Sequence, residues 1–225
     1  MKLTELLLNL LFPPKCPFCQ RVMDAPAVCP VCEQALPWTG EGETLKTLPG
    51  GILCAAPLWY EDLAREGLLR FKFQGARSAA GPLGELVARC AAEQFPGEFD
   101  TVTWVPVSKK RLRKRGYDQA RLLAENACRL WDTKPVQLLQ KYVDNPAQSG
   151  LTEAAARKAN VLGVYETANG ADIAGKHILL VDDICTTGAT LAECVRVLKD
   201  AGAANVVCAA VAQTRERNVY NSEQK

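Results

Sequence analysis

The chain of 225 residues is long enough for one substantial hydrophobic core and a small additional module. Hydrophobic residues make up 48% and charged residues 23%, and the net charge is +2, so the composition excludes a disordered or generally basic protein. Any contact with nucleic acid must therefore come from a local patch. Six of the ten cysteines occur singly in apolar or helical surroundings, which favours free thiols in a reducing compartment, and we expect a cytoplasmic protein.

The opening stretch "MKLTELLLNLLFPP" predicts an amphipathic helix over residues 1–13, ended by Pro13 and Pro14. It has no small-residue cleavage site and is too short to span a bilayer. We expect its leucines to pack on the main body and we expect no stable membrane insertion. Contact with a membrane surface is the weaker alternative.

Residues 16–32 read "CPFCQRVMDAPAVCPVC", which is two Cys-x2-Cys pairs separated by nine residues. Two such pairs can supply four thiolates to a tetrahedral zinc ion, which predicts a structural site made by Cys16, Cys19, Cys29 and Cys32. The loop between the pairs is shorter than in most zinc ribbons. A redox role for one pair is disfavoured because no thioredoxin-like βαβ pattern surrounds it. We assign residues 14–50 to this module and a linker, since residues 36–51 are rich in glycine, threonine and proline.

Residues 51–215 are predicted to form one α/β domain, followed by a C-terminal tail over 216–225. Apolar runs of strand length alternate with helical patterns. Strands are expected over 51–60, 101–107, 134–140, 177–183 and 205–214, and helices over 79–95, 117–131 and 189–203. This alternation predicts a parallel sheet flanked by helices on both faces. Ligands of such sheets bind at the carboxyl ends of the strands.

The stretch "ILLVDDICTTGAT", residues 178–190, places Asp182 and Asp183 between a buried strand and a turn of small and hydroxyl-bearing residues. The turn and the start of the next helix can present backbone N–H groups and hydroxyls to a phosphate. The residues expected to do so are Thr186, Thr187, Gly188, Ala189 and Thr190. Carboxylates beside a phosphate cradle suit a ligand with hydroxyls near its phosphate. The stretch therefore predicts a ribose 5-phosphate derivative; the alternative is an ordinary aspartate-rich turn.

A basic stretch directly follows the strand expected over 101–107, so it should emerge on the same edge of the sheet as residues 186–190. It comprises Lys109, Lys110, Arg111, Arg113, Lys114 and Arg115. One interpretation is a solvated helix or loop surface. A second is stabilisation of a departing pyrophosphate. Because the positive charge exceeds what one pyrophosphate needs, a third is contact with a nucleic-acid backbone.

Residues 178–190 resemble the PRPP-binding signature of type I phosphoribosyltransferases, in which four apolar residues and two acids precede a phosphate loop. With "LLFPPKCPFC", residues 104–124 and residues 145–160, the chain resembles the ComF family over nearly its whole length. The resemblance implies a zinc finger fused to a type I phosphoribosyltransferase-like domain, PRPP with magnesium, and a link to competence and DNA uptake. It assigns Asp182 and Asp183 to the ribose hydroxyls and, in an enzyme, to catalysis.

The resemblance leaves three functions open. They are an enzyme that displaces pyrophosphate from PRPP with an unidentified nitrogen nucleophile, a PRPP-binding protein without turnover, and an accessory protein that binds single-stranded DNA or a competence helicase. Residues 145–160 occupy the position of a mobile loop that closes over PRPP, and the matching residues are Gln148, Ser149, Arg157 and Asn160. A helix capped at Thr152 is the alternative interpretation of this segment.

Two departures from the family pattern carry expectations of their own. Longer members have a second set of paired cysteines, which residues 33–53 lack, so we expect one zinc ion. Thr186 stands where purine-salvage enzymes of the superfamily place an aspartate. Because a threonine hydroxyl cannot act as a general base near neutral pH, we expect no efficient transfer to purines.

Overall fold

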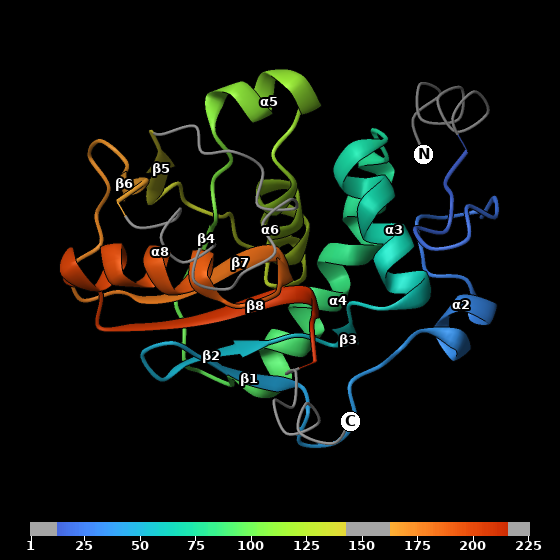
Figure 1. The fold of residues 1–225 in the computed structure, drawn as a ribbon, viewed down its shortest axis with the longest axis horizontal. Helices are drawn as coiled ribbons and strands as arrows, with labels where there is room; N and C mark the ends of the chain where they lie inside the picture. Colours follow the sequence, from blue (N-terminus) through green and yellow to red (C-terminus); the bar gives the residue numbers. More distant parts are fainter. Residues whose placement is uncertain (1–12, 143–162, 216–225) are drawn as a thin grey trace, which may run out of the picture.

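The computed structural model describes residues 13–142 and 163–215, and its central feature is a six-stranded sheet (Figure 1). The strands are β1 (Leu45–Leu48), β2 (Ile52–Ala55), β3 (Leu58–Trp59), β4 (Thr101–Trp104), β7 (His177–Cys185) and β8 (Asn205–Gln213). Their order is β1-β2-β8-β7-β4, and β3 pairs with β8 beyond the end of β2. All pairs are parallel except β1–β2. The predicted α/β fold is confirmed.

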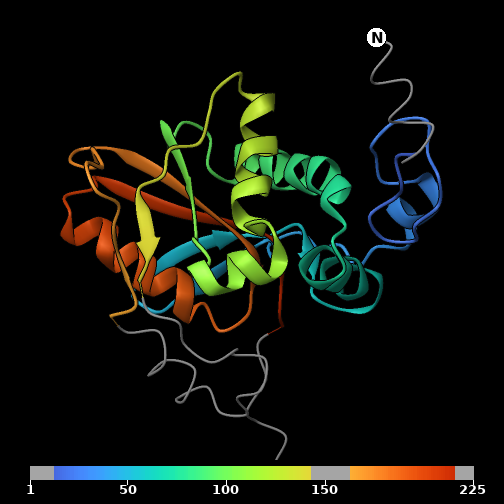
Figure 2. The same cartoon turned by 90° about the horizontal axis from the view of Figure 1, so that it is seen from above.

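Helices cover both faces of this sheet, as the alternating pattern predicted (Figure 2). The helices are α2 (Pro30–Ala35), α3 (Asp62–Phe73), the 3-10 turn η1 (Arg77–Ala79), α4 (Ala80–Gln94), α5 (Lys109–Arg115), α6 (Gln119–Leu130) and α8 (Ala189–Asp200). Helix α8 packs on one face of the sheet, whereas α4 and α6 pack on the other. The sheet therefore separates two hydrophobic cores.

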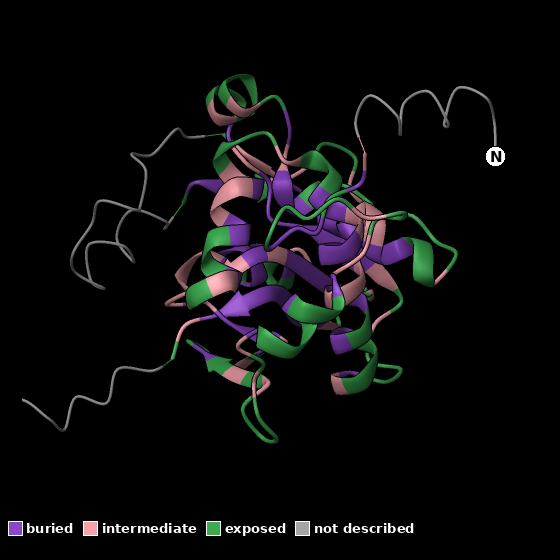
Figure 3. Ribbon diagram, turned by 90° about the vertical axis from the view of Figure 1, so that its right-hand side faces the viewer, coloured by how far each residue is buried: buried purple, intermediate pink, exposed green. Residues whose placement is uncertain are grey.

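Strand β7 shows why the sequence before the two acids is a continuous apolar run. Leu179 and Val181 belong to the core with α4 and α6, and Ile178 and Leu180 belong to the core with α8. Alternate side chains of a strand point to opposite faces of the sheet, so a strand covered on both faces needs apolar residues at every position. All four residues are buried, and buried segments gather at the centre of the molecule in Figure 3.

Three segments differ from the expectations for them. Residues 36–51 were predicted to be a loop or linker, but they include β1, an edge strand joined to β2 by a short turn. Helix α3 was not predicted, although its buried positions follow the helical period. The strand expected over 134–140 begins only at Leu139, where β5 (Leu139–Lys141) pairs with β6 (Tyr165–Thr167) in a separate two-stranded sheet.

The N-terminal cysteine module packs directly on α3 and lies at one end of the molecule in Figure 2. Gly67 of α3 faces the ring of Phe18 so closely that a Cβ at Gly67 would stand 2.7 Å from it. Arg70 donates a hydrogen bond to the backbone carbonyl of Phe18. Cys16, Phe18 and Cys29 belong to the same buried cluster as residues of α3, α4 and α6. The module and the sheet domain therefore share one core.

The predicted helix over 1–13 and the predicted tail over 216–225 fall outside the described residues, apart from Pro13. Within the described part of the chain, every helix is too short or too polar to cross a bilayer. The cytoplasmic location and the boundary near Gly51 stay predictions.

Candidate functional site

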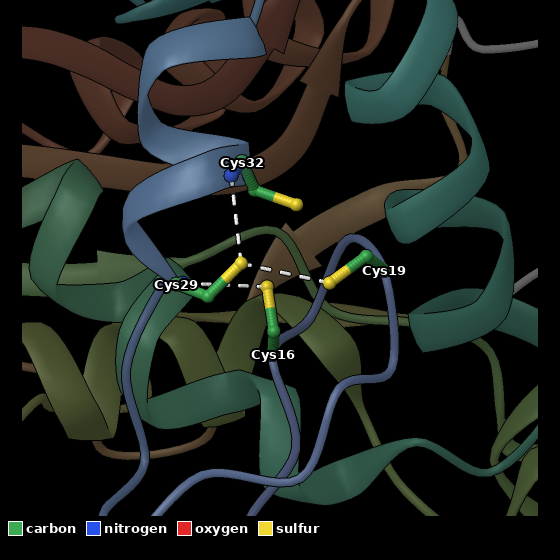
Figure 4. A group of neighbouring side chains, drawn as sticks. All are labelled: Cys16, Cys19, Cys29 and Cys32. Carbon is green, nitrogen blue, oxygen red and sulfur yellow. Dashed lines mark hydrogen bonds between the residues drawn. The ribbon is translucent and has the colours of Figure 1, made fainter.

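The four cysteines of the N-terminal module converge as their spacing predicted (Figure 4). Their sulfur atoms all lie within 4.8 Å of one another, and the Cys19 and Cys29 sulfurs are 3.6 Å apart. Sulfurs bound at about 2.3 Å to a tetrahedral zinc ion stand about 3.8 Å apart. The donor set and its spacing therefore fit a structural zinc ion.

The local backbone favours the thiolate form of Cys29. This residue caps α2, where its sulfur accepts the Cys32 N–H at 3.4 Å, and that hydrogen bond lowers the pKa of the Cys29 thiol. Pro30 at the start of the helix has no N–H to leave unpaired. The second Cys-Pro-x-Cys thus places a metal ligand at a helix N-terminus.

A second site lies at the carboxyl edge of the sheet, around the end of β7. A cavity of about 330 Å³ opens there between α3, α5, the β5–β6 sheet and the N-terminus of α8. Its lining includes Lys72, Arg111, Arg115, Asp182, Asp183 and all of residues 184–191. Strand β4 pairs with β7 only as far as Val181, so the two acids lie just beyond the end of the neighbouring strand. This confirms that the acids, the loop and part of the basic stretch share one edge.

Asp183 is held by a lysine that the sequence did not reveal. The Lys72 ammonium, near the end of α3, donates to Oδ1 of Asp183 at 3.0 Å and lies 2.9 Å from Oδ2. The helical period of residues 64–71 is a signal that could have located α3. No local pattern could have paired Lys72 with an acid 111 positions later in the chain.

Asp182 has a different environment, although it is the next residue. Its Oδ1 accepts the backbone N–H of Asp183 at 2.8 Å. Removal from water, with the charge of Asp183 as the second cause, raises the pKa of the Asp182 carboxyl to about 8. Near neutral pH the two adjacent acids therefore carry less than two full negative charges.

The loop between β7 and α8 is a tight turn of small and hydroxyl-bearing residues beside the cavity. Gly188 has φ +73°, a left-handed conformation, and α8 begins at the next residue. The Thr187 hydroxyl accepts the Ala189 N–H at 3.5 Å, and the Thr186 carbonyl accepts the Thr214 hydroxyl at 3.3 Å. The loop backbone and the first turn of α8 line the cavity, where they can present N–H groups to an anion.

The basic stretch forms α5, which begins after the cap Ser108 and ends at Gly116 in the left-handed conformation. Arg111 and Arg115, four residues apart, line the cavity. The other cations, Lys109, Lys110, Arg113 and Lys114, are exposed to solvent. No residue of α5 is buried, and it is the uppermost helix in Figures 1 and 3. The helix therefore divides the stretch between the cavity and the outer surface.

Further side chains complete the cavity wall without having been predicted. Tyr60, Phe73 and Tyr165 supply aromatic surface, and Gln119 supplies an amide. Gln119 accepts a hydrogen bond from Arg115 Nη1 at 2.9 Å and so helps to position that guanidinium. The residues predicted for a mobile loop, Gln148, Ser149, Arg157 and Asn160, lie outside the described residues.

Family models match both parts of the chain. A model of the phosphoribosyl transferase domain matches residues 113–223, which contain both acids and the loop between β7 and α8. A model of the double zinc ribbon domain matches residues 7–43. That segment has four cysteines, which the structure brings into a single cluster within the residues that it describes.

Two curated proteins are similar to most of the chain. Competence protein ComFC of Bacillus subtilis (strain 168) is 29% identical over 190 residues, which cover 84% of this chain and 73% of the relative. DNA utilization protein YhgH of Escherichia coli (strain K12) is 27% identical over 206 residues, which cover 80% of this chain and 87% of the relative.

Among solved structures, the glutamine PRPP amidotransferase of B. subtilis in complex with ADP and GMP is 21% identical with a TM-score of 0.43. That match covers 63% of this chain but only 30% of the larger protein. The two family models and the curated relatives agree with the cysteine cluster and the parallel sheet described above. Together, the two family models and the curated relatives support a ComF-type protein, with a zinc-ribbon module joined to a phosphoribosyltransferase-type domain.

Proposed function

We propose that the cavity at the end of β7 binds PRPP, or another ribose 5-phosphate ligand, together with magnesium. The observation that carries this proposal is the presence of a phosphate loop, two acids and two arginines in one cavity. Residues 186–190 would bind the 5-phosphate through backbone N–H groups and hydroxyls. Asp182 and Asp183 would accept hydrogen bonds from the ribose hydroxyls. Arg111 and Arg115 would bind the pyrophosphate.

The donors also fit magnesium, which prefers oxygen ligands from one or two carboxylates together with substrate phosphates. The carboxylates of Asp182 and Asp183 and the pyrophosphate oxygens of PRPP supply such a set. Bound there, magnesium would neutralise charge on the pyrophosphate. The raised pKa of Asp182 means that such binding near neutral pH releases a proton from this carboxyl.

The same cavity is compatible with transfer and with binding alone. In transfer, a nitrogen nucleophile forms a bond to C1 of the ribose while the bond from C1 to the pyrophosphate oxygen breaks, and the electron pair leaves with pyrophosphate. The nucleophile then loses its proton to solvent. Thr186 offers no base for that proton, so an amine or an already anionic base suits this site better than a purine. Release of pyrophosphate from radiolabelled PRPP, assayed across purines, pyrimidines and ammonia, separates turnover from binding.

Calorimetric titration with PRPP and Mg²⁺ tests the binding proposal. The double variant Asp182→Asn and Asp183→Asn keeps side-chain size but removes the acids, so its affinity for PRPP should fall by at least about tenfold. The control is the double variant Asp172→Asn and Asp200→Asn, which removes two acids of surface ion pairs outside the cavity. Equal affinity in parent, site variant and control would contradict the proposal.

A second function is favoured by the outer surface of α5. Lys109, Lys110, Arg113 and Lys114 are exposed there, and none of them lines the cavity. We propose that this surface binds the phosphates of single-stranded DNA, in a protein linked to competence and DNA uptake. The names of the ComFC and YhgH relatives support that link. A helicase of the uptake machinery is the protein partner that this role suggests.

A further inference from the structure

Lys72 holds the acid that the proposed function assigns to the ribose hydroxyls. Its ammonium lies 3.0 Å from Oδ1 and 2.9 Å from Oδ2 of Asp183, so it contacts both carboxylate oxygens. The pair is partly buried, since 26% of the Lys72 side chain and 10% of the Asp183 side chain are exposed. A ligand that hydrogen-bonds to both oxygens of Asp183 therefore competes with the ammonium for this nearly buried carboxylate.

The backbone around Lys72 is held in place by the segment that follows α5. The Tyr117 hydroxyl donates to the Phe71 carbonyl, and Gln119 Nε2 donates to the Lys72 carbonyl at 3.5 Å. The Arg115 guanidinium lies over the ring of Phe73, 5.0 Å from its centre. Because the end of α3 is fixed by these contacts, the ammonium can move by side-chain rotation while the helix stays in position.

The cavity that Lys72 lines is also lined by two arginines. Arg115 packs on Phe73, the residue next to Lys72, and Arg111 lines the same cavity. A pyrophosphate bound by these arginines would stand beside a ribose bound to Asp183, since both groups are attached to one sugar. The lysine has a flexible stem with rotatable donors, so its ammonium can exchange one anion for another nearby.

We propose that Lys72 is a displaceable counter-ion that makes the site selective for a ribose phosphate carrying pyrophosphate. Without ligand, its ammonium neutralises Asp183. When the ribose hydroxyls bind Asp183, the ammonium moves to the pyrophosphate. PRPP thus replaces the contact that it breaks, whereas ribose 5-phosphate breaks the contact and offers no replacement. This inference rests on the proposed function and adds to it a residue that selects the ligand.

The test compares the affinities of PRPP and ribose 5-phosphate for the parent and for Lys72→Met, at one fixed Mg²⁺ concentration. The variant should bind PRPP more weakly, because one hydrogen bond to a charged group is lost, and ribose 5-phosphate at least as tightly, because the competing ammonium is gone. The preference for PRPP over ribose 5-phosphate should therefore fall by about tenfold or more.

Lys176→Met is the matched control, since Lys176 forms a similar lysine–aspartate pair with Asp172 on the surface and does not line the cavity. The control should keep the parent's preference. Lys72→Gln serves as a second variant if Lys72→Met does not fold, as judged by circular dichroism. A preference unchanged in a folded Lys72 variant, or lost equally in the control, would overturn the role of Lys72. Failure of the parent to bind either ligand would overturn the proposed function, and this inference with it.

Discussion

Replacing Gly188 with alanine should destabilise the protein and distort the phosphate loop, for two separable reasons. Gly188 has φ +73°, and a left-handed conformation costs an alanine roughly 1–2 kcal/mol. The added Cβ would also stand 2.6 Å from Cδ2 of Leu48, a residue of β1 that is 3% exposed. Relief of such overpacking costs about 1–3 kcal/mol more. We expect the free energy of unfolding to fall by about 2–5 kcal/mol.

Gly175 provides a matched control. It has the same φ of +73°, but a Cβ there would have no atom within 4 Å. Gly175→Ala should therefore show the conformational cost alone, about 1–2 kcal/mol. The difference between the two variants, measured by urea unfolding, isolates the contact with Leu48.

A double-mutant cycle tests the physical cause directly. Leu48→Ala removes the two closest atoms and leaves the Leu48 Cβ position at 3.2 Å, so the cost of Gly188→Ala in that background should fall most of the way to the cost of Gly175→Ala. Calorimetry on the same proteins should show weaker PRPP binding for Gly188→Ala than for Gly175→Ala. A cost of Gly188→Ala no larger than that of Gly175→Ala, or a cost that Leu48→Ala does not reduce, would refute the steric contact with Leu48 as its cause.

Three further predictions concern the metal, the acids and α5. Protein prepared without chelator should contain one zinc per chain and Cys16→Ser should lose it, as measured by metal analysis; a zinc-free parent or a zinc-replete variant contradicts the assignment. The folded state raises the pKa of Asp182 to about 8. Between about pH 4 and pH 8 the native protein therefore keeps a proton that the unfolded chain has lost. This residue thus makes the free energy of unfolding fall as the pH rises through that range. Asp182→Asn has no such proton. The free energy of unfolding of this variant minus that of the parent, measured in urea, should therefore increase from pH 5.5 to pH 8. The same value at both pH values would show that the pKa of Asp182 is ordinary. Replacing Lys109, Lys110, Arg113 and Lys114 with glutamine should flatten the log-log salt dependence of single-stranded DNA binding by about 0.7 per lost phosphate contact. Replacing Arg111 and Arg115 with glutamine should instead weaken PRPP binding. If this double variant and the fourfold variant weakened DNA binding equally, the cavity and the outer surface of α5 would not be separate binding surfaces.

The parts of the site that are contiguous in the chain could be predicted from the sequence. Residues 178–190 contain a buried strand, two acids and a tight turn, and each has a local pattern that implies its structure. The basic stretch was placed on the correct edge because it follows a parallel strand, and parallel strands end at the same edge. Two cations of that stretch, Arg111 and Arg115, line the cavity, and the other four are exposed. This division could not be predicted, because it depends on where α5 begins.

The contacts that the sequence did not reveal depend on tertiary packing. Lys72 meets Asp183 because the end of α3 and the end of β7 line the same cavity, and no periodicity encodes that arrangement. Strand β1 was missed for another reason: it has four residues between stretches rich in glycine and proline, so composition suggested a loop. The Gly50–Gly51 turn before Ile52 was a hairpin signal that could have corrected this prediction.

The contact between Phe18 and Gly67 would make a zinc ion in the cysteine cluster a folding partner of the sheet domain. If the metal organises the cysteine module, it also organises the surface on which α3 rests, and α3 carries Lys72. Loss of the ion would then expose apolar surface of the main core, so metal-free chains would be the first to aggregate or to be degraded. The supply of zinc in the cell would thereby limit how much folded protein accumulates, whether or not a ligand is bound.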